Sequence, residues 1–365
     1  MENYKLTLSN TKIILSDNID DLGTFKESID YIIDTFVGNK EERNIKITLV
    51  DNVEADIFNT IIKPLVDYFM ESLYYSETNS VYVPYFLLYV ETTKQSYNEE
   101  QLLFLEENLV GLTQCFSDAL SDEYRDLLMN VCPACNLKLI ITPDNADHLF
   151  EIINGLTDFY HLCFDLDWIR CEDLDLSITK EQLDLYGKYI TDAFDAYEVP
   201  LVSLNIDNAF CKLTIAYDAQ SQGEYRTSPL STWYYREGVG SLGDCTILNG
   251  NIYLNQCCLE DVFKIGSVYE DLDSAVVDTI VNTESYSCNL CDECYMQRIC
   301  NNGNAGINYM LGQEFNVMNS VYCQWTSLML SLAHDITTHF DAEQNNDLFK
   351  AYFTGATQRG VKLEY

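Results

Sequence analysis

Short apolar runs alternate with longer segments of helical periodicity over the first two thirds of the chain. The runs are nearly continuous and rich in leucine and β-branched residues, as expected for strands buried on both faces of a parallel sheet. Seven of them are predicted strands: 12–15, 45–50, 85–91, 109–113, 137–142, 162–167 and 201–206. Four segments between them are predicted helices: 22–37, 55–73 (with a kink at Pro64), 145–156 and 179–194. Repeated strand–helix units predict an α/β fold with a full or partial β/α barrel.

The pattern changes near residue 225. An Asn-Gly pair lies between two β-prone runs in 241–274, which predicts a hairpin. A cysteine-dense stretch follows, and 321–340 has the pattern of a final apolar helix. We therefore predict a barrel over 1–225, a second module over 226–345 and a peripheral tail over 346–365.

Composition narrows the functional classes. The chain has 365 residues and a formal net charge of −37, which disfavours nucleic acid as a partner and favours a basic one. No apolar run is long enough to span a membrane, and the first residues, MENYKLTLSN, lack a signal-peptide pattern, so we expect a cytoplasmic protein. In a reducing compartment, the 14 cysteines point to metal binding or redox chemistry rather than to disulfides.

Four cysteines fall within 288–300, CNLCDECYMQRIC. Cys288, Cys291 and Cys294 offer two overlapping C-x-x-C pairs, and Cys300 follows six positions after Cys294. Cys323 comes later, at the start of the predicted final helix. Four thiolates can form a closed tetrahedral zinc site or hold an iron–sulfur cluster. The residue types alone leave both open.

The order Cys291-x2-Cys294-x5-Cys300 followed by a distant cysteine resembles the SPASM domain, the C-terminal module of many radical S-adenosylmethionine (radical SAM) enzymes that modify ribosomally made peptides. The stretches GNIYLNQC (250–257), FKIGSVYEDLD (263–273) and CNNGN (300–304) are similar to the segments around that run in the family. The resemblance favours a [4Fe–4S] cluster on Cys291, Cys294, Cys300 and Cys323, with Cys288 as a bystander. By their chemistry alone, the same four thiolates also suit zinc.

Upstream segments extend the resemblance over most of the chain. VGLTQCFSDALSDEYRDL (110–127) and LKLIITPDNADHLFEIINGL (137–156) are similar to successive strand–turn–helix units of the family. The resemblance therefore implies the partial barrel of radical SAM proteins, which agrees with the pattern described above. Because no added segment stands before the predicted barrel in this sequence, we expect peptide recognition to use the barrel, the second module or another chain.

The departures from the family concern its catalytic residues. Radical SAM enzymes carry C-x3-C-x2-C after the first barrel strand, and Lys12, Ser16 and Ile19 occupy those three positions here. No cysteine precedes Cys115. The family's Gly-Gly-Glu-Pro motif is replaced by residues 51–54, DNVE, whose side chains cannot match the close backbone approach of glycines. We therefore expect no cleavage of S-adenosylmethionine (AdoMet).

A first auxiliary cluster, which the family's module also carries, lacks its ligands here. The corresponding positions read 237–239, Asn255 and Asn304. Cys245, Cys257 or Cys258 could substitute only through a shift of register, so we expect a single metal centre.

Two other patterns are interpreted as structural: the first as core or edge cysteines, the second as histidines with a surface or packing role. Cys132-x-x-Cys135 stands before a predicted strand without a second pair, and His334 and His339 lack the spacing of a metal-binding helix face. No acid/base or nucleophile constellation stands out.

The resulting hypothesis is a catalytically silent radical SAM-like protein of peptide maturation, a pseudoenzyme that binds a precursor peptide, an active maturation enzyme, or both. The alternatives are an enzyme with repurposed barrel chemistry, an electron-transfer subunit that uses the auxiliary cluster, and a structural subunit with zinc.

Overall fold

The computed structural model describes residues 9–37, 44–80, 82–210, 213, 244–254, 256, 258–273, 275–276, 305–314, 319–343 and 346–363. The chain forms two compact units that interleave along the sequence. The first comprises Met1–Gln114, Tyr235–Ser287 and Asn304–Val317, and the second Cys115–Tyr234, Cys288–Gly303 and Met318–Tyr365. The predicted module boundary near residue 225 lies outside the described residues.

Parallel strands form the first unit's sheet. In spatial order they are β4 (Gly111–Phe116), β3 (Tyr85–Thr92), β2 (Asn44–Asp51), β1 (Asn10–Ile14) and β7 (Asp244–Leu248). Each neighbouring pair is parallel, so the predicted α/β class with a parallel sheet is confirmed. The register pairs Lys12 of β1 with Thr48 of β2, and Thr48 with Tyr89 of β3. These three side chains therefore share one face of the sheet.

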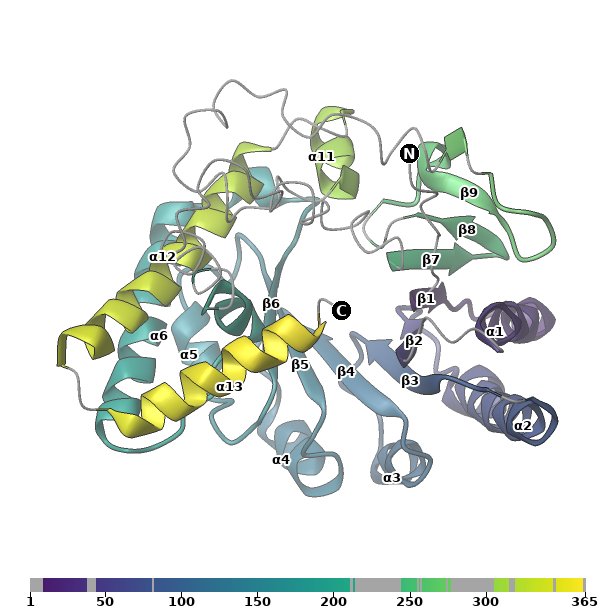
Figure 1. Cartoon of the computed structure of the whole chain (residues 1–365), viewed down its shortest axis with the longest axis horizontal. Coiled ribbons are helices and arrows are strands. Elements are labelled where there is room, and N and C mark those ends of the chain that lie inside the picture. The colour runs from purple at the N-terminus through teal and green to yellow at the C-terminus, as the bar shows by residue number, and fades with distance from the viewer. Residues whose placement is uncertain are drawn as a thin grey trace. The chain divides into compact units, whose positions relative to one another are not determined.

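Helices cover the other face of this sheet. They are α1 (Leu22–Phe36), α2 (Lys63–Asn79) and α3 (Glu99–Glu107). The unit also contains α11 (Ala305–Gly312), nearer the end of the chain. Figure 1 shows α1 and α2 on the same side of β1, β2 and β3. Phe25, Ile29, Ile32 and Phe36 are buried at the helical spacing of three and four that the sequence predicts for α1. Pro64 stands in the first turn of α2, after a π-helical turn over Phe58–Ile62, and so begins the straight helix.

The Asn-Gly hairpin is confirmed. Strand β8 (Asn251–Tyr253) runs antiparallel to β7, and β9 (Lys264–Ser267) runs antiparallel to β8. Asn249 and Gly250 both have positive φ, 50° and 76°, as a two-residue hairpin turn of type I′ requires.

The second unit contains β5 (Asn136–Ile141) and β6 (Leu162–Leu166), which are parallel neighbours. Its helices are α4 (Asp122–Val131), α5 (Leu149–Asn154), α6 (Leu176–Asp195), α12 (Ser320–Glu343) and α13 (Asp347–Leu363). Helix α12 runs along α6 (Figure 1), where a Cβ at Gly187 would lie 2.5 Å from Cδ1 of Leu332. The segment expected as a tail is helical, and Phe349 of α13 stacks on Phe340 of α12.

The prediction of a strand over 201–206 is wrong. The segment makes one parallel bridge, from Ser203 to Leu162, and residues 204–210 are helical. The Asn205 side chain then takes the place of a neighbouring strand: its amide accepts from the Phe164 N–H at 2.7 Å and donates to the Phe164 carbonyl at 3.0 Å. Because these bonds satisfy backbone groups at the exposed side of β6, a further strand is not needed there.

Candidate functional site

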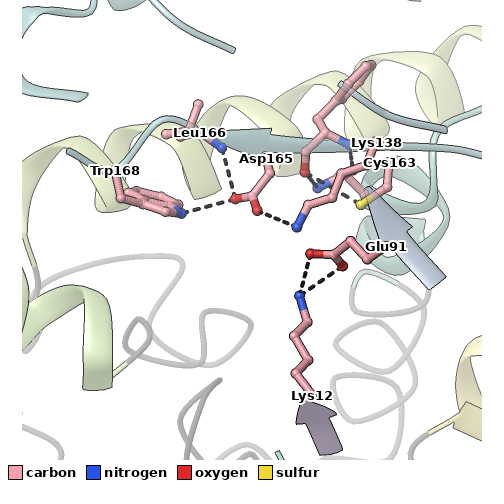
Figure 2. A network of polar contacts seen from close by, with 9 residues as sticks. Lys12, Glu91, Lys138, Cys163, Asp165, Leu166 and Trp168 are labelled. Carbon is pink, nitrogen blue, oxygen red and sulfur yellow. Dashed lines mark hydrogen bonds and ion pairs between the residues drawn. The ribbon is translucent and has the colours of Figure 1, made fainter. Parts of the chain in front are cut away.

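An ion pair crosses the inner face of the first unit's sheet. Lys12 on β1 reaches over β2 to Glu91 on β3, and its Nζ lies 2.9 Å from both carboxylate oxygens (Figure 2). The two side chains are only 17% and 15% exposed, so solvent screens the pair less than it would screen a surface pair. The ammonium group that replaces the first expected cysteine is therefore already paired.

The two positions after Lys12 in the radical SAM pattern are also unsuited to iron. Ser16 donates from Oγ to Asp21 Oδ2 at 2.6 Å, and Ile19 begins a short 3-10 helix, Ile19–Asp21, with its apolar side chain 57% exposed. Iron–sulfur clusters are held by thiolates. A protonated amine, a hydrogen-bonded hydroxyl and an alkyl group do not fit such a cluster.

A second ion pair stands where the glycine motif is expected. Asp51 ends β2 with a fully buried side chain, and it accepts from Lys94 Nζ at 2.8 and 3.1 Å and from the Tyr97 hydroxyl at 2.7 Å. Lys94 also donates to the Ala55 carbonyl at 2.5 Å, so its three ammonium hydrogens are all used. A fully engaged ammonium is not available as a nucleophile.

The predicted fourth thiolate, Cys323, lies in the first turn of α12 and is exposed. Asn319 caps this helix by accepting from the Val321 N–H at 2.8 Å. The neighbouring Tyr322 is buried and stacks on Trp168 with ring centroids 5.3 Å apart. The start of α12, and Cys323 with it, is therefore fixed against the second unit's own strand end.

A polar network supports this stack from the sheet. The Trp168 indole donates to Asp165 Oδ1 at 3.0 Å, and Lys138 on β5 pairs with Asp165 Oδ2 at 2.9 Å (Figure 2). The backbone N–H of Leu166 also donates to Asp165. The carboxylate thus has fixed donors on both oxygens, and it orients the ring on which Tyr322 rests.

The other predicted metal ligands, Cys291, Cys294 and Cys300, lie outside the described residues, as do Cys288, Cys257, Asn255 and Asn304. Whether the three thiols meet Cys323 stays a prediction. Among the ranges that the structure describes, no group of three His, Cys, Asp or Glu side chains could hold a metal ion.

Two of the substitutes considered for a first auxiliary cluster are core residues. Cys245 is fully buried on β7, beside Thr11 of β1, and Cys258 is 1% exposed. Burial raises the pKa of the Cys258 thiol, which disfavours the thiolate that a metal requires. Both positions therefore suit packing better than metal ligation.

The second C-x-x-C is buried as well. Cys132 and Cys135 stand between α4 and β5, 3% and 1% exposed. His339 pairs with Asp195 at 3.1 Å rather than sharing a helix face with His334. These positions agree with core packing for the two cysteines and with a surface role for His339.

Sequence reasoning missed the partners in these networks: Glu91, Lys94, Lys138, Asp165 and Trp168. A signal was present. Parallel strands buried on both faces are apolar, yet the runs YFLLYVE (85–91), LKLIIT (137–142) and LCFDLD (162–167) each contain a charged residue. A charge in such a run indicates a paired group on one face of the sheet.

No helix in the described part of the chain is long and apolar enough to cross a membrane. No protein-family model matches the chain, and no curated protein matches it. Solved structures of similar fold include several of anSMEcpe, an anaerobic sulfatase-maturating enzyme of the radical SAM and SPASM type.

Native anSMEcpe with bound AdoMet and Cp18Cys peptide has a TM-score of 0.63 and 11% identity, and the match covers 92% of this chain and 99% of that one. The structure with Kp18Cys peptide has a TM-score of 0.63 and 11% identity, with 88% and 90% covered. The structure with AdoMet alone has a TM-score of 0.61 and 10% identity, with 92% and 100% covered. The chain therefore has the partial β/α barrel fold of the radical SAM type that its sequence predicts.

Proposed function

We propose that this chain is a radical SAM-like protein of ribosomal peptide maturation that binds a precursor peptide, an active maturation enzyme, or both, and does not cleave AdoMet itself. One observation carries the proposal. The fold matches an AdoMet- and peptide-bound enzyme over nearly its whole length, while the position of the first cluster thiolate holds Lys12 in an ion pair with Glu91.

Two ion pairs take over the strand ends that the resemblance assigns to cluster and cofactor. Lys12–Glu91 ties β1 to β3, and Asp51–Lys94 ties β2 to the segment after β3. Each cation neutralises a carboxylate in a partly or fully buried setting, so neither carboxylate is left as an uncompensated charge. The first unit is thereby organised by its own side chains, and the carboxyl ends of its strands form a surface for a ligand rather than a radical centre.

A single metal centre is proposed in the second module, held by Cys291, Cys294, Cys300 and Cys323. A [4Fe–4S] cluster bound there would supply structural cross-linking or electron transfer, and zinc would supply cross-linking alone. The exposure of Cys323 on a rigidly capped helix start supports its part in this site.

The charge of the chain supports the choice of partner. At −37, the molecule attracts basic surfaces and accelerates their encounter, and it repels other strongly acidic molecules. We therefore propose a peptide or maturation enzyme that presents lysine and arginine residues.

The decisive experiment is anaerobic purification of the full chain, followed by iron, sulfide and zinc analysis and a visible spectrum. We expect about four irons per chain, or one zinc if the site is structural. About eight irons would indicate that a second cluster is present. Incubation with AdoMet and a strong reductant should yield no 5′-deoxyadenosine, and its formation would overturn the proposal of a silent barrel. A redox titration of the loaded protein then separates electron transfer from a purely structural role.

A further inference from the structure

Two helices of this chain end on a large apolar residue in the left-handed backbone conformation. Leu109 follows α3 with φ 55°, and Tyr197 follows α6 with φ 60°. At Tyr197 the bonds are those of a Schellman motif: its N–H donates to the Phe194 carbonyl at 3.0 Å, and the next N–H to the Ala193 carbonyl at 2.9 Å. Glycine is the usual residue there, because a Cβ is unfavourable in this conformation. The backbone conformation at position 197 therefore does not explain why a tyrosine, rather than a glycine, is found there.

Burial does not explain Tyr197 either, because its side chain is 66% exposed. Tyr160 and Val199 nearby are 70% and 63% exposed. The parallel bridge between Leu162 and Ser203 brings the two segments that carry these residues into the sheet side by side, at the amino end of β6. Three exposed apolar side chains therefore gather on neighbouring loops, where a monomer gains nothing from exposing them.

The same loops are acidic. Segments 154–161 and 192–199 contain four carboxylates and no lysine or arginine. Asp158 and Glu198 are exposed beside the tyrosines, whereas Asp195 is paired with His339 at 3.1 Å. Exposed aromatic rings bordered by carboxylates are best suited to bind an arginine guanidinium. This group is planar, stacks on tyrosine and forms bidentate hydrogen bonds to carboxylates.

We propose that the tyrosine surface, defined as Tyr160, Tyr197 and Val199 with Asp158 and Glu198, docks an arginine-rich segment of a partner protein. Charge complementarity selects this occupant. A second copy of the chain carries the same −37 and is repelled, and an anionic lipid surface is repelled for the same reason. The site lies at the amino end of β6, so it is distinct from the carboxyl strand ends considered under the proposed function, and it goes beyond that proposal.

The probe is a labelled peptide of alternating arginine and glycine, compared by fluorescence anisotropy with a lysine–glycine peptide of equal length and charge. We expect the full chain to bind the arginine peptide several-fold more tightly. Tyr160→Ala and Tyr197→Gly should each weaken arginine-peptide binding by about two- to fivefold, the range of an exposed cation–π contact. Tyr197→Gly should do so while raising thermal stability, which a merely structural tyrosine would not.

The control is a Tyr85→Ala variant. Tyr85 is 65% exposed, but the segment around it, 78–90, contains no aspartate or glutamate, so we expect binding to be unchanged. Equal affinity for the two peptides, an equal loss in Tyr85→Ala, or unaltered binding by Tyr160→Ala and Tyr197→Gly would each overturn the proposal. None of these outcomes affects metal content or 5′-deoxyadenosine formation, so the proposed function is tested separately.

Discussion

The segment from Lys12 to Ile19, which runs from β1 into the 3-10 turn after it, and the start of α12 differ in the side chains that they place at potential metal-ligand positions. In the first of these segments, the three positions that the resemblance assigns to thiolates hold Lys12, Ser16 and Ile19, and the first two are paired with carboxylates of the first unit. At α12, the thiol of Cys323 is exposed on a helix turn that is held by a cap and an aromatic stack.

The difference teaches that a fold and a metal site depend on different numbers of residues. Parallel pairing and helix packing depend on apolar residues spread over many positions, so a barrel does not need cluster ligands in order to form. A metal site depends on a few side chains, and each replacement removes it at once. In the first unit, Lys12 and Ser16 contact carboxylates, whereas the Cys323 thiol of the second unit is exposed, as the proposed metal site requires.

The largest effect that tests this comparison is the loss of metal. Cys323→Ser removes one of four proposed thiolates, so bound iron or zinc should fall by at least about tenfold, as measured by metal analysis of anaerobically purified protein. Cys288→Ser is the matched control and should leave metal content unchanged. Loss of metal in the control, with retention in Cys323→Ser, would reassign the fourth ligand.

The next effect concerns the buried pair at the end of β2. Lys94→Met leaves the fully buried Asp51 carboxylate without its cation, which should destabilise the first unit by about 3 to 5 kcal/mol. That corresponds to a fall in Tm of roughly 6 to 20 °C for a unit of this size, measured by calorimetry. The double variant Asp51→Leu/Lys94→Met removes both charges and should recover part of the loss. A Tm unchanged in Lys94→Met would show that the pair does not stabilise the strand ends.

A smaller effect is expected at Lys12, since both partners retain some contact with solvent. Lys12→Met should lower stability by about 1 to 2 kcal/mol, with a coupling to Glu91→Gln of about 1 kcal/mol in a double-mutant cycle. If the stability losses of Lys12→Met and Glu91→Gln simply add, the two residues act independently. The ion pair would then not stabilise the first unit.

The smallest expected change in stability is at Leu109, which lies outside both the Lys12–Ile19 segment and the start of α12. Leu109→Gly relieves an unfavourable left-handed residue after α3 and should raise the free energy of unfolding by up to about 1 kcal/mol, less the backbone entropy of glycine. The readout is a rise in Tm of a few degrees at most, and binding of the arginine peptide should stay unchanged. A lower Tm would mean that the exposed leucine side chain contributes more than its backbone conformation costs.

The sequence alone determined the features that depend on neighbouring residues. Apolar runs separated by helical periodicity predict the parallel α/β fold, and Asn249-Gly250 predicts its hairpin. The absence of cysteine before Cys115 is a fact of composition. The strand prediction for 201–206 is wrong because its four apolar residues suit a strand and the start of a helix equally well. In the structure the Asn205 amide, rather than a further strand, bonds to the backbone of Phe164.

Only the tertiary structure decided which charges meet. Lys12 and Glu91 are 79 positions apart, Asp51 and Lys94 are 43 apart, and Trp168 and Tyr322 lie on segments far apart in the chain. Local patterns carry no information about such pairs, because their distance follows from strand register and crossover geometry rather than from spacing along the chain. The sequence therefore showed that no cysteine lies in the first strands of the barrel. The tertiary structure showed that the ion pairs Lys12–Glu91 and Asp51–Lys94 connect those strands.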